Sequence, residues 1–454
     1  MHSPLHPARV GTIAAPSQKR IESVLLVLIA ILILEGLLRR MVPALNFVFF
    51  FVKDLLVLVL GILTLASDPH PVAKKLLMMQ GAFFLLMVPP ALSTSLHDPV
   101  LAVFGIKQYV LFPFAASGLC AAFLPDRRHD LQKLCGRVAY SLIPTALLAL
   151  LQSKLPGDHW LNKTPDGESL EAFGAGGQLR VSSSFPFVAQ YGMYLNALVP
   201  FVAVWSCMRR FRQRAFLTKT LPLLAVILPL LILSIFITGS RLAVLGVASS
   251  TVVGVMALGF TRGRRFLPYV LLIVGIGALC YPLLKAVHPD SFAAYEARTT
   301  TTEINGPSNT EETTGRVLEG MVNWLPMTYH QPPLGNGLGI MSNGSQKISS
   351  YAASVRIDGY WMETELATIM YEGGVYVLLV WYGLRLCIIA YTGLCLLTIG
   401  DPKLATGACF CWGFVLVEGL MGTLSIQPPL AIWWWLCVGL ILCLREFDRE
   451  TEAP

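Results

Sequence analysis

Two glutamates stand where a long polar stretch of the chain gives way to an apolar run that begins at Leu366. A carboxylate at the mouth of a membrane-embedded site can take a proton from a nucleophile and so act as a general base. We therefore interpret Glu363 as the candidate catalytic residue. Glu365 is counted with the candidate substrate-binding residues, although the helix dipole alone also favours a carboxylate in the first turn of a following helix.

Four cationic residues are the candidates for binding an anionic part of a substrate. Arg241 follows Thr-Gly-Ser at the end of an apolar run, and Arg316 follows Thr-Thr-Gly at the predicted start of a short helix. A guanidinium can bind two phosphate oxygens at once, and a helix N-terminus adds unpaired N–H donors. Arg180 and Lys107 complete the set. The alternative for each is an interfacial or loop cation whose charge extends into water.

The composition places these residues in a membrane protein. Of the 454 residues, 55% are hydrophobic and only 13% are charged, and the mean hydropathy is +0.63. Such values are typical of polytopic helical membrane proteins. The net charge of +7 does not indicate a nucleic-acid partner, because the basic residues form short clusters between apolar runs. Neither a phosphate-binding loop nor a metal-ligand spacing appears, so no cofactor and no metal are expected.

The apolar runs predict an all-α fold with about 12 transmembrane helices, since each crossing needs about 20 residues. One long polar interval, 285–365, separates the ninth and tenth helices. The tenth run is longer than one crossing, so it tilts, extends past the bilayer or breaks near Gly373-Gly374. The predicted spans are 21–38, 42–66, 76–96, 100–123, 138–155, 185–208, 216–238, 242–260, 266–287, 366–399, 404–425 and 428–444.

The basic residues predict the orientation, because cytoplasmic loops carry an excess of Lys and Arg. With both termini inside, 20 of the 34 basic residues fall on the cytoplasmic side. This gives a cytoplasmic segment 1–20 that shows no cleaved signal peptide, a membrane domain 21–444 and a cytoplasmic tail 445–454. Loops 154–184 and 285–365 then face the periplasm. Arg39-Arg40, at an outer turn, is the exception to the charge rule.

Several charged residues lie within predicted spans, and intramembrane charge is a functional hypothesis by default, so five of them are singled out. Lys53 and Asp54 are adjacent, so they point in different directions and need separate partners. The sequence leaves the roles of the five open. They are Glu35, Lys53, Asp54, Arg385 and Glu418.

Taken together, these segments resemble the O-antigen ligase and O-antigen polymerase superfamily of membrane glycosyltransferases. The resemblance rests on the order and topology of short motifs between Lys154 and Val375. The motifs are Arg180-Val181 through Phe185, Gly239-Ser240-Arg241, Gly315-Arg316 followed by Trp324, Pro333-Leu334-Gly335-Asn336-Gly337-Leu338-Gly339 and Glu372-Gly373-Gly374-Val375.

The resemblance implies a GT-C-type helical fold in the bacterial inner membrane, with its active site facing the periplasm. It also implies metal-independent glycosyl transfer from an undecaprenyl-diphosphate-linked glycan, with Arg241, Arg316 and Arg180 binding the diphosphate. Ligases carry a His-Asn pair before the Glu-x-Gly of the next helix. Counting nine residues back from Glu372 reaches Glu363-Thr364 instead. This difference favours a polymerase of O-antigen or exopolysaccharide.

Two other functions stay open at this point. One is a ligase that transfers the glycan to lipid A core or to protein. The other, from a different class, is a transporter or flippase that uses the intramembrane charges as a path. For a polymerase, the expected partners besides the lipid bilayer are the chain-length regulator and the flippase of the same pathway.

Overall fold

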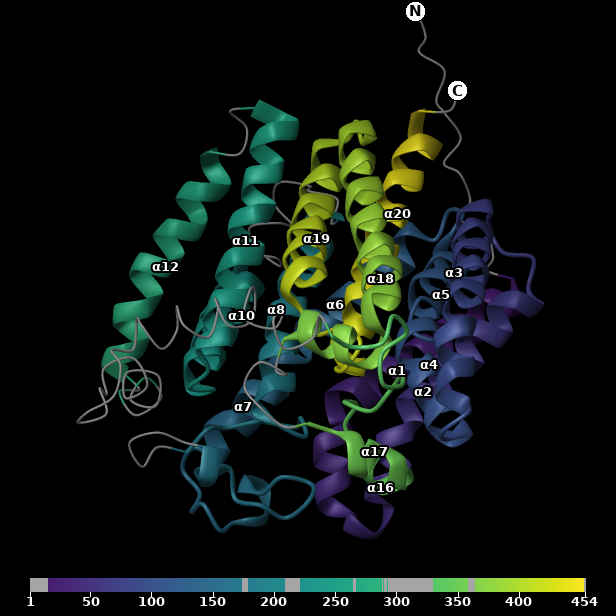
Figure 1. Cartoon of the computed structure of the whole chain (residues 1–454). Helices are drawn as coiled ribbons and strands as arrows, with labels where there is room; N and C mark the ends of the chain where they lie inside the picture. The colour runs from purple at the N-terminus through teal and green to yellow at the C-terminus, as the bar shows by residue number, and fades with distance from the viewer. Residues whose placement is uncertain are drawn as a thin grey trace, which may run out of the picture.

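Helices form nearly all regular structure in the computed structural model of the chain (Figure 1). The structure describes residues 15–173, 179–208, 221–263, 267–287, 289, 292, 330–357 and 364–452. No strand occurs among them. The helices are α1 (Pro16–Met41), α2 (Asn46–Ala66), α3 (Pro71–Ser95), α4 (Pro99–Val110), α5 (Phe114–Phe123), α6 (Arg128–Tyr140), α7 (Leu142–Gln152), α8 (Val188–Met208), α10 (Leu221–Ile237), α11 (Arg241–Arg262), α12 (Leu267–Val287), α16 (Ser345–Ile348), α17 (Ser350–Val355), α18 (Glu365–Thr398), α19 (Pro402–Met421) and α20 (Pro428–Glu452).

The predicted all-α, multi-pass membrane architecture is confirmed at the level of helix length and composition. Within the described residues, nine helices are long and apolar enough to cross a membrane. The number rises to ten if α4 and α5, bent by 46° at their junction, form one span. The predictions at 216–238 and 266–287 coincide with α10 and α12, which are not among those nine. Twelve crossings therefore stay a prediction.

The helices differ in how deeply they lie in the bundle. In the most apolar 18-residue stretch of α20, 89% of the residues are buried, whereas in the corresponding stretch of α3 only 28% are buried. The consecutive residues Trp433, Trp434 and Trp435 are all fully buried. Leu85 of α3 and Phe260 of α11 are by contrast 69% and 85% exposed. A helix that is apolar all round belongs in the interior, and outward apolar side chains suit a lipid environment.

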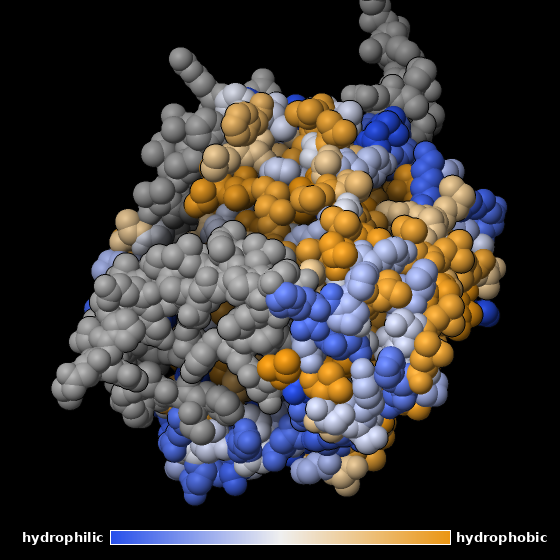
Figure 2. Space-filling model, viewed as in Figure 1, coloured by the Kyte–Doolittle hydropathy of each residue, from blue (hydrophilic) through white to orange (hydrophobic). Residues whose placement is uncertain are grey.

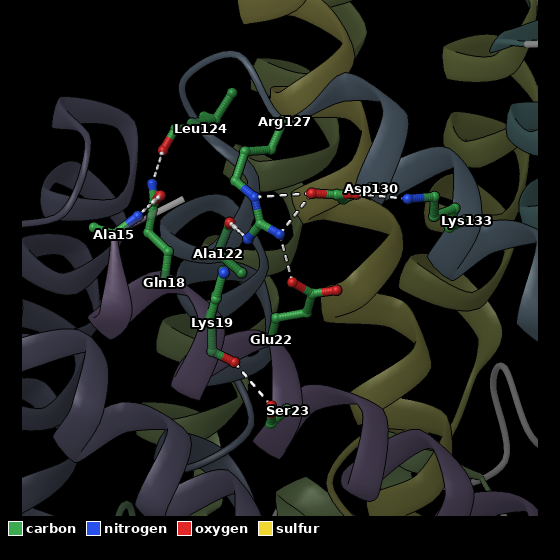
Figure 3. Close-up of polar contacts among 10 residues, drawn as sticks. All are labelled: Ala15, Gln18, Lys19, Glu22, Ser23, Ala122, Leu124, Arg127, Asp130 and Lys133. Carbon is green, nitrogen blue, oxygen red and sulfur yellow. Dashed lines mark hydrogen bonds and ion pairs between the residues drawn. The ribbon is translucent and has the colours of Figure 1, made fainter. Parts of the chain in front are cut away.

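Contacts among turns far apart in the sequence define one end of the bundle. Arg127, in the turn between α5 and α6, pairs with Glu22 of α1 at 2.5 Å and with Asp130 at 2.7 Å (Figure 3). The backbone N–H groups of Gly400 and Asp401, between α18 and α19, donate to the Asp448 carboxylate near the end of α20. The first set of bonds joins the start of α1 to the turn between α5 and α6, and the second joins the turn between α18 and α19 to the end of α20. The charge rule assigns this end of the bundle to the cytoplasm.

The opposite end carries α16, α17 and the segment after α7, and we call it the outer end because the charge rule predicts that it faces the periplasm (Figure 1). Lys347 of α16 pairs with Asp166 of that segment at 3.3 Å. Hydrophilic residues gather at this end, and apolar residues spread over the flank of the bundle (Figure 2). Among the described residues, the predicted cytoplasmic segments and the two predicted periplasmic loops thus lie at opposite ends of the bundle.

The long helix α18 is broken at a glycine. Gly374 has φ 62° and ψ −166°, outside the helical region. A positive φ is accessible to glycine without the penalty that a Cβ brings. The structure therefore shows a break near Gly373-Gly374, one of the three alternatives that the sequence left open.

The separation of the two ends predicts the result of topology mapping. Reporter fusions after Asn343, beside α16, and after Asp448, near the end of α20, should fall on opposite sides of the membrane. The charge rule further predicts that the Asn343 fusion is periplasmic and the Asp448 fusion cytoplasmic. Two fusions on the same side of the membrane would contradict the fold. A cytoplasmic Asn343 fusion together with a periplasmic Asp448 fusion would contradict only the orientation.

Candidate functional site

The break in α18 is filled by a segment of the long polar interval. The N–H groups of Asn336 and Gly337 donate to the carbonyls of Tyr371 and Glu372, each at 2.9 Å. The N–H of Tyr376 donates to the carbonyl of Pro333 at 3.2 Å. Unpaired backbone groups at membrane depth cost several kcal/mol each, so this exchange of hydrogen bonds stabilises both segments. Two of the motifs that carry the family resemblance are thus in direct contact.

The Glu372 side chain completes this junction. One carboxylate oxygen accepts from the N–H of Met341 at 2.6 Å, and the other accepts from the Tyr109 hydroxyl of α4 at 3.0 Å. Thr94 of α3 adds a hydroxyl that accepts from the N–H of Leu338 at 2.8 Å. Segment 333–341 is therefore held between α3, α4 and α18.

Glycines allow the close approach of these backbones. A Cβ on Gly374 would overlap the Pro333 carbonyl oxygen, and one on Gly335 would overlap the backbone at Glu372. Gly339 has φ +85°, and a Cβ there would lie 2.7 Å from the Cα of Gly105 in α4. Segment 333–339 can pack this tightly because these positions lack side chains.

The outer surface adds a second attachment for the long interval. The Asp98 carboxylate caps α4 by accepting from the N–H groups of Val100 and Leu101 at 2.9 and 3.1 Å. A hydrogen bond from the Ser349 hydroxyl holds the pKa of Asp98 below its usual value. The rings of His97 and Tyr351 stack with centroids 4.9 Å apart. The region of α16 and α17 is thereby fixed over the turn between α3 and α4.

A cluster of charges lies beside this junction, in the outer half of α1 and α2. The Glu35 carboxylate is shared by Arg39 and Lys53, each at 3.1 Å. Glu35 and Lys53 are both about 2% exposed. The three side chains together carry one excess positive charge. The Lys53 ammonium also lies 4.3 Å from the centre of the Phe50 ring, a favourable cation–π distance.

Asp54 has a different partner from Lys53, as their adjacency predicts. Its carboxylate pairs with Lys107 of α4. The Lys107 ammonium lies between the rings of Phe51 and Phe104, at 4.9 and 4.5 Å from their centres. Lys107, a predicted substrate-binding residue, is therefore placed in an ion pair at the side of the cluster.

A small pocket of about 30 Å³ lies at the charge cluster. The amide oxygens of Gln108 and Gln190 are buried there and have no hydrogen-bond partner within the described part of the chain. A buried amide oxygen without a partner costs stability unless a water or ligand donates to it. The pocket therefore offers cationic donors together with unused acceptors. Its lining residues are Glu35, Arg39, Phe50, Lys53, Gln108, Pro186, Gln190, Asn343, Ile426, Gln427, Pro428 and Pro429.

Arg40 fastens one wall of the pocket. Its buried guanidinium donates to the Ser183 carbonyl at 2.8 Å and also to the Ser182 hydroxyl and the Phe185 carbonyl. The Ser184 hydroxyl donates back to the Ile33 carbonyl at 2.5 Å. These bonds fix the segment that leads into α8 against the outer end of α1.

The other predicted site residues fall at several places. Arg180 donates to the carbonyl of Thr238 at 3.4 Å, so it lies beside the turn that precedes Arg241. Arg241 is the first residue of α11, and the Ser240 side chain caps that helix. The structure thus brings these two motif segments together. Arg316 and Glu363 lie outside the described residues.

Glu365 is the first residue of α18 and is buried in an ion pair. One oxygen of its carboxylate lies 3.2 Å from the Arg385 guanidinium and accepts from the Trp381 indole N–H and the Ser425 N–H, each at 2.9 Å. Arg385 also donates to carbonyls at the end of α19, including Gly419 at 2.6 Å. This geometry gives Glu365 a positioning role where α18 begins.

Arg39, Arg40, Gln108 and Gln190 were not among the predicted site residues. The sequence did mark the two arginines as unusual, because they are basic residues at a turn that the charge rule places on the periplasmic side. The glutamines left none, since a single amide in an apolar run has no pattern of its own. Among the described residues, no group of three or more His, Cys, Asp and Glu is arranged to hold a metal ion.

Neither a protein family model nor a curated protein matches this sequence. The resemblance to the O-antigen ligase and polymerase superfamily consequently rests on the motifs themselves and stays a prediction.

The junction at the broken helix predicts a contrast between two glycines of α18. Gly374→Ala should destabilise the protein by about 1–3 kcal/mol or more, because alanine is strained at that φ and overlaps Pro333. Gly383→Ala should be neutral or stabilising by up to about 1 kcal/mol, since it lies in regular helix with open space at its Cβ position. Thermal unfolding of the purified variants in one detergent measures both. Equal stability of the two variants would contradict the junction.

Proposed function

We propose that the protein polymerises a bacterial surface polysaccharide, O-antigen or exopolysaccharide. It would transfer a glycan from a polyprenyl-diphosphate carrier to a sugar hydroxyl on the periplasmic face of the inner membrane. The observation that carries the proposal is the pocket at the outer end. Arg39 and Lys53 lie there with the amide oxygens of Gln108 and Gln190, which have no partner among the described residues. A phosphorylated sugar needs both kinds of group, since its phosphates accept and its hydroxyls donate hydrogen bonds.

The reaction assigns a task to each part of this site. The acceptor hydroxyl oxygen bonds to the anomeric carbon of the donor, and the bond from that carbon to the phosphate oxygen breaks. The electron pair leaves on the diphosphate, whose growing charge is stabilised by preorganised cations. Arg39 and Lys53 supply that charge in the pocket, and Arg180, Arg241 and Arg316 are the further candidates. Glu363 takes the proton of the acceptor hydroxyl.

The glycine-rich junction supports the same proposal by its location. It holds segment 333–341 against α4, where Gly339 packs on Gly105, and α4 supplies both Lys107 and Gln108. Asn343, a few residues further along, lines the pocket. A rigid support of this kind keeps reacting groups in place at little entropic cost during the reaction.

A ligase would use the same donor and the same leaving group, so the pocket favours neither enzyme. Glu363 at the position of the ligase histidine is the reason to propose the polymerase. The pathway's flippase and chain-length regulator are the partners this proposal implies. No metal and no further cofactor take part in it.

A transporter is the second candidate, and one observation bears on it. Glu372 is buried and Glu418 is half-buried, and neither carboxylate has a salt bridge in the described part of the chain. Glu372 instead binds Met341 and Tyr109, and Glu418 accepts from the Asn196 amide at 2.6 Å. Both carboxylates are thus engaged in holding helices and loops together, which favours the enzyme.

The proposal predicts two separable kinetic effects in transfer from a purified lipid-linked donor. Arg39→Lys keeps the charge beside Glu35 but loses the planar fork, so the KM for the donor should rise about tenfold. Glu363→Gln cannot accept a proton, so kcat should fall about 10²–10⁴-fold.

Two matched variants serve as controls for these effects. Arg449 pairs with a glutamate at 3.1 Å, the same distance as between Arg39 and Glu35, but it lies at the opposite end of the bundle, so Arg449→Lys is the control for Arg39→Lys. Glu168→Gln changes an exposed glutamate of the outer loop. Both should turn over normally. Wild-type kinetics for Arg39→Lys would remove the pocket from the proposal, and a wild-type kcat for Glu363→Gln would remove the base.

A further inference from the structure

A second cavity lies at the end of the bundle opposite to the candidate site. It has a volume of about 350 Å³ and opens along α6 near the end of α8. Its lining is cationic and aromatic, in contrast to the carboxylate-centred pocket at the outer end. The residues that line it are His129, Gln132, Lys133, Gly136, Arg137, Tyr140 and Trp205.

Three of these residues form a basic stripe on one face of α6. His129, Lys133 and Arg137 are spaced four residues apart, so they lie one above another on the helix. All three are exposed. Within the described part of the chain, neither the Arg137 guanidinium nor the His129 ring has a hydrogen bond or an ion pair. The stripe thus presents charge that the protein itself does not use.

The nearby carboxylate does not neutralise this stripe. Asp130 accepts from Lys133 at 3.2 Å, but it also binds the Arg127 guanidinium at 2.7 Å (Figure 3). Arg127 in turn is shared with Glu22 of α1. One carboxylate therefore serves two cations, and Arg137 adds a third positive charge at the cavity. The cavity keeps a net positive charge.

Aromatic rings line the other part of the cavity. Tyr140 and Trp205 meet edge to face, with ring centres 5.5 Å apart. Gly136 leaves room for the indole, since a Cβ there would lie 2.9 Å from it. Tyr and Trp are the residues that concentrate at the level of lipid headgroups. The cations follow α6 from His129 in its first turn to Arg137 in its last turn, and Tyr140 is the last residue of the helix.

The depth of the cavity identifies the ligand. The stripe occupies the first turns of a candidate membrane span, Arg128–Gln152. This end also carries the segments that the charge rule assigns to the cytoplasm. Basic pockets between helices at this level bind anionic lipid headgroups. We propose that the cavity binds one anionic phospholipid, with its phosphate on Lys133 and Arg137 and its acyl chains beside Tyr140 and Trp205. This inference does not depend on the proposed glycan transfer.

Native mass spectrometry of the full-length protein in neutral detergent micelles tests the site, with added phosphatidylglycerol as the probe. The wild-type protein should retain one phosphatidylglycerol more tightly than phosphatidylcholine. Arg137→Gln should weaken that binding about fivefold, and Lys133→Gln with Arg137→Gln about 25-fold, from the usual contribution of each basic residue near anionic lipid.

Lys75→Gln is the matched control, because Lys75 is an exposed lysine at the start of α3 on the same end of the bundle. It should leave the tight binding unchanged, and inorganic phosphate at millimolar concentration should not displace the lipid. Unchanged retention in the double variant would overturn the proposal. So would an equal loss in Lys75→Gln, equal retention of phosphatidylcholine, or displacement by inorganic phosphate, which would indicate a site for the free anion.

Discussion

The hydrogen bonds between the broken helix α18 and segment 333–341 are the constraint on which the outer end of this protein depends. A helix interrupted at membrane depth leaves backbone groups that lipid cannot satisfy. Here the carbonyls of Tyr371 and Glu372 accept from Asn336 and Gly337, and the Glu372 carboxylate reaches across to Met341 and Tyr109. The long polar interval is therefore built into the helical bundle at this point. The described groups next to this junction, such as Asn343 in the pocket, are thereby held in place.

The pairing of buried charges within the bundle leaves an excess positive charge at the pocket. Buried charges are stable only when they are paired and hydrogen-bonded. Glu365 is matched by Arg385 and Asp54 by Lys107, whereas Glu35 serves two cations. The excess positive charge thus falls at Arg39 and Lys53, next to amide oxygens that have no partner in the described chain. An anionic, hydroxyl-rich ligand complements that combination, and this is the physical basis of the proposed glycan transfer.

Much of the fold could be predicted from the sequence because an apolar run of about 20 residues predicts a transmembrane helix. A break at Gly373-Gly374 was one of three alternatives for the extra length of the tenth apolar run, and the separate partners of Lys53 and Asp54 followed from their adjacency. Contacts between distant parts of the chain could not be predicted. Tyr109 and Glu372, for example, meet across 263 positions of the chain. Gln108 and Gln190 gain their significance only from burial. The candidate base Glu363 and the candidate Arg316 lie outside the described residues, so their roles still rest on the motifs.

The central claim is that this outer site joins lipid-linked glycan units to one another. The lipid-linked glycans that accumulate in a strain lacking the protein test it most directly, with separation by size and release of the glycan from its diphosphate. The account predicts single repeat units on the polyprenyl carrier, restored to polymer by the wild-type gene. Accumulation of full-length polymer on the carrier would contradict a polymerase and indicate a ligase. An unchanged profile of lipid-linked glycans would contradict glycan transfer altogether.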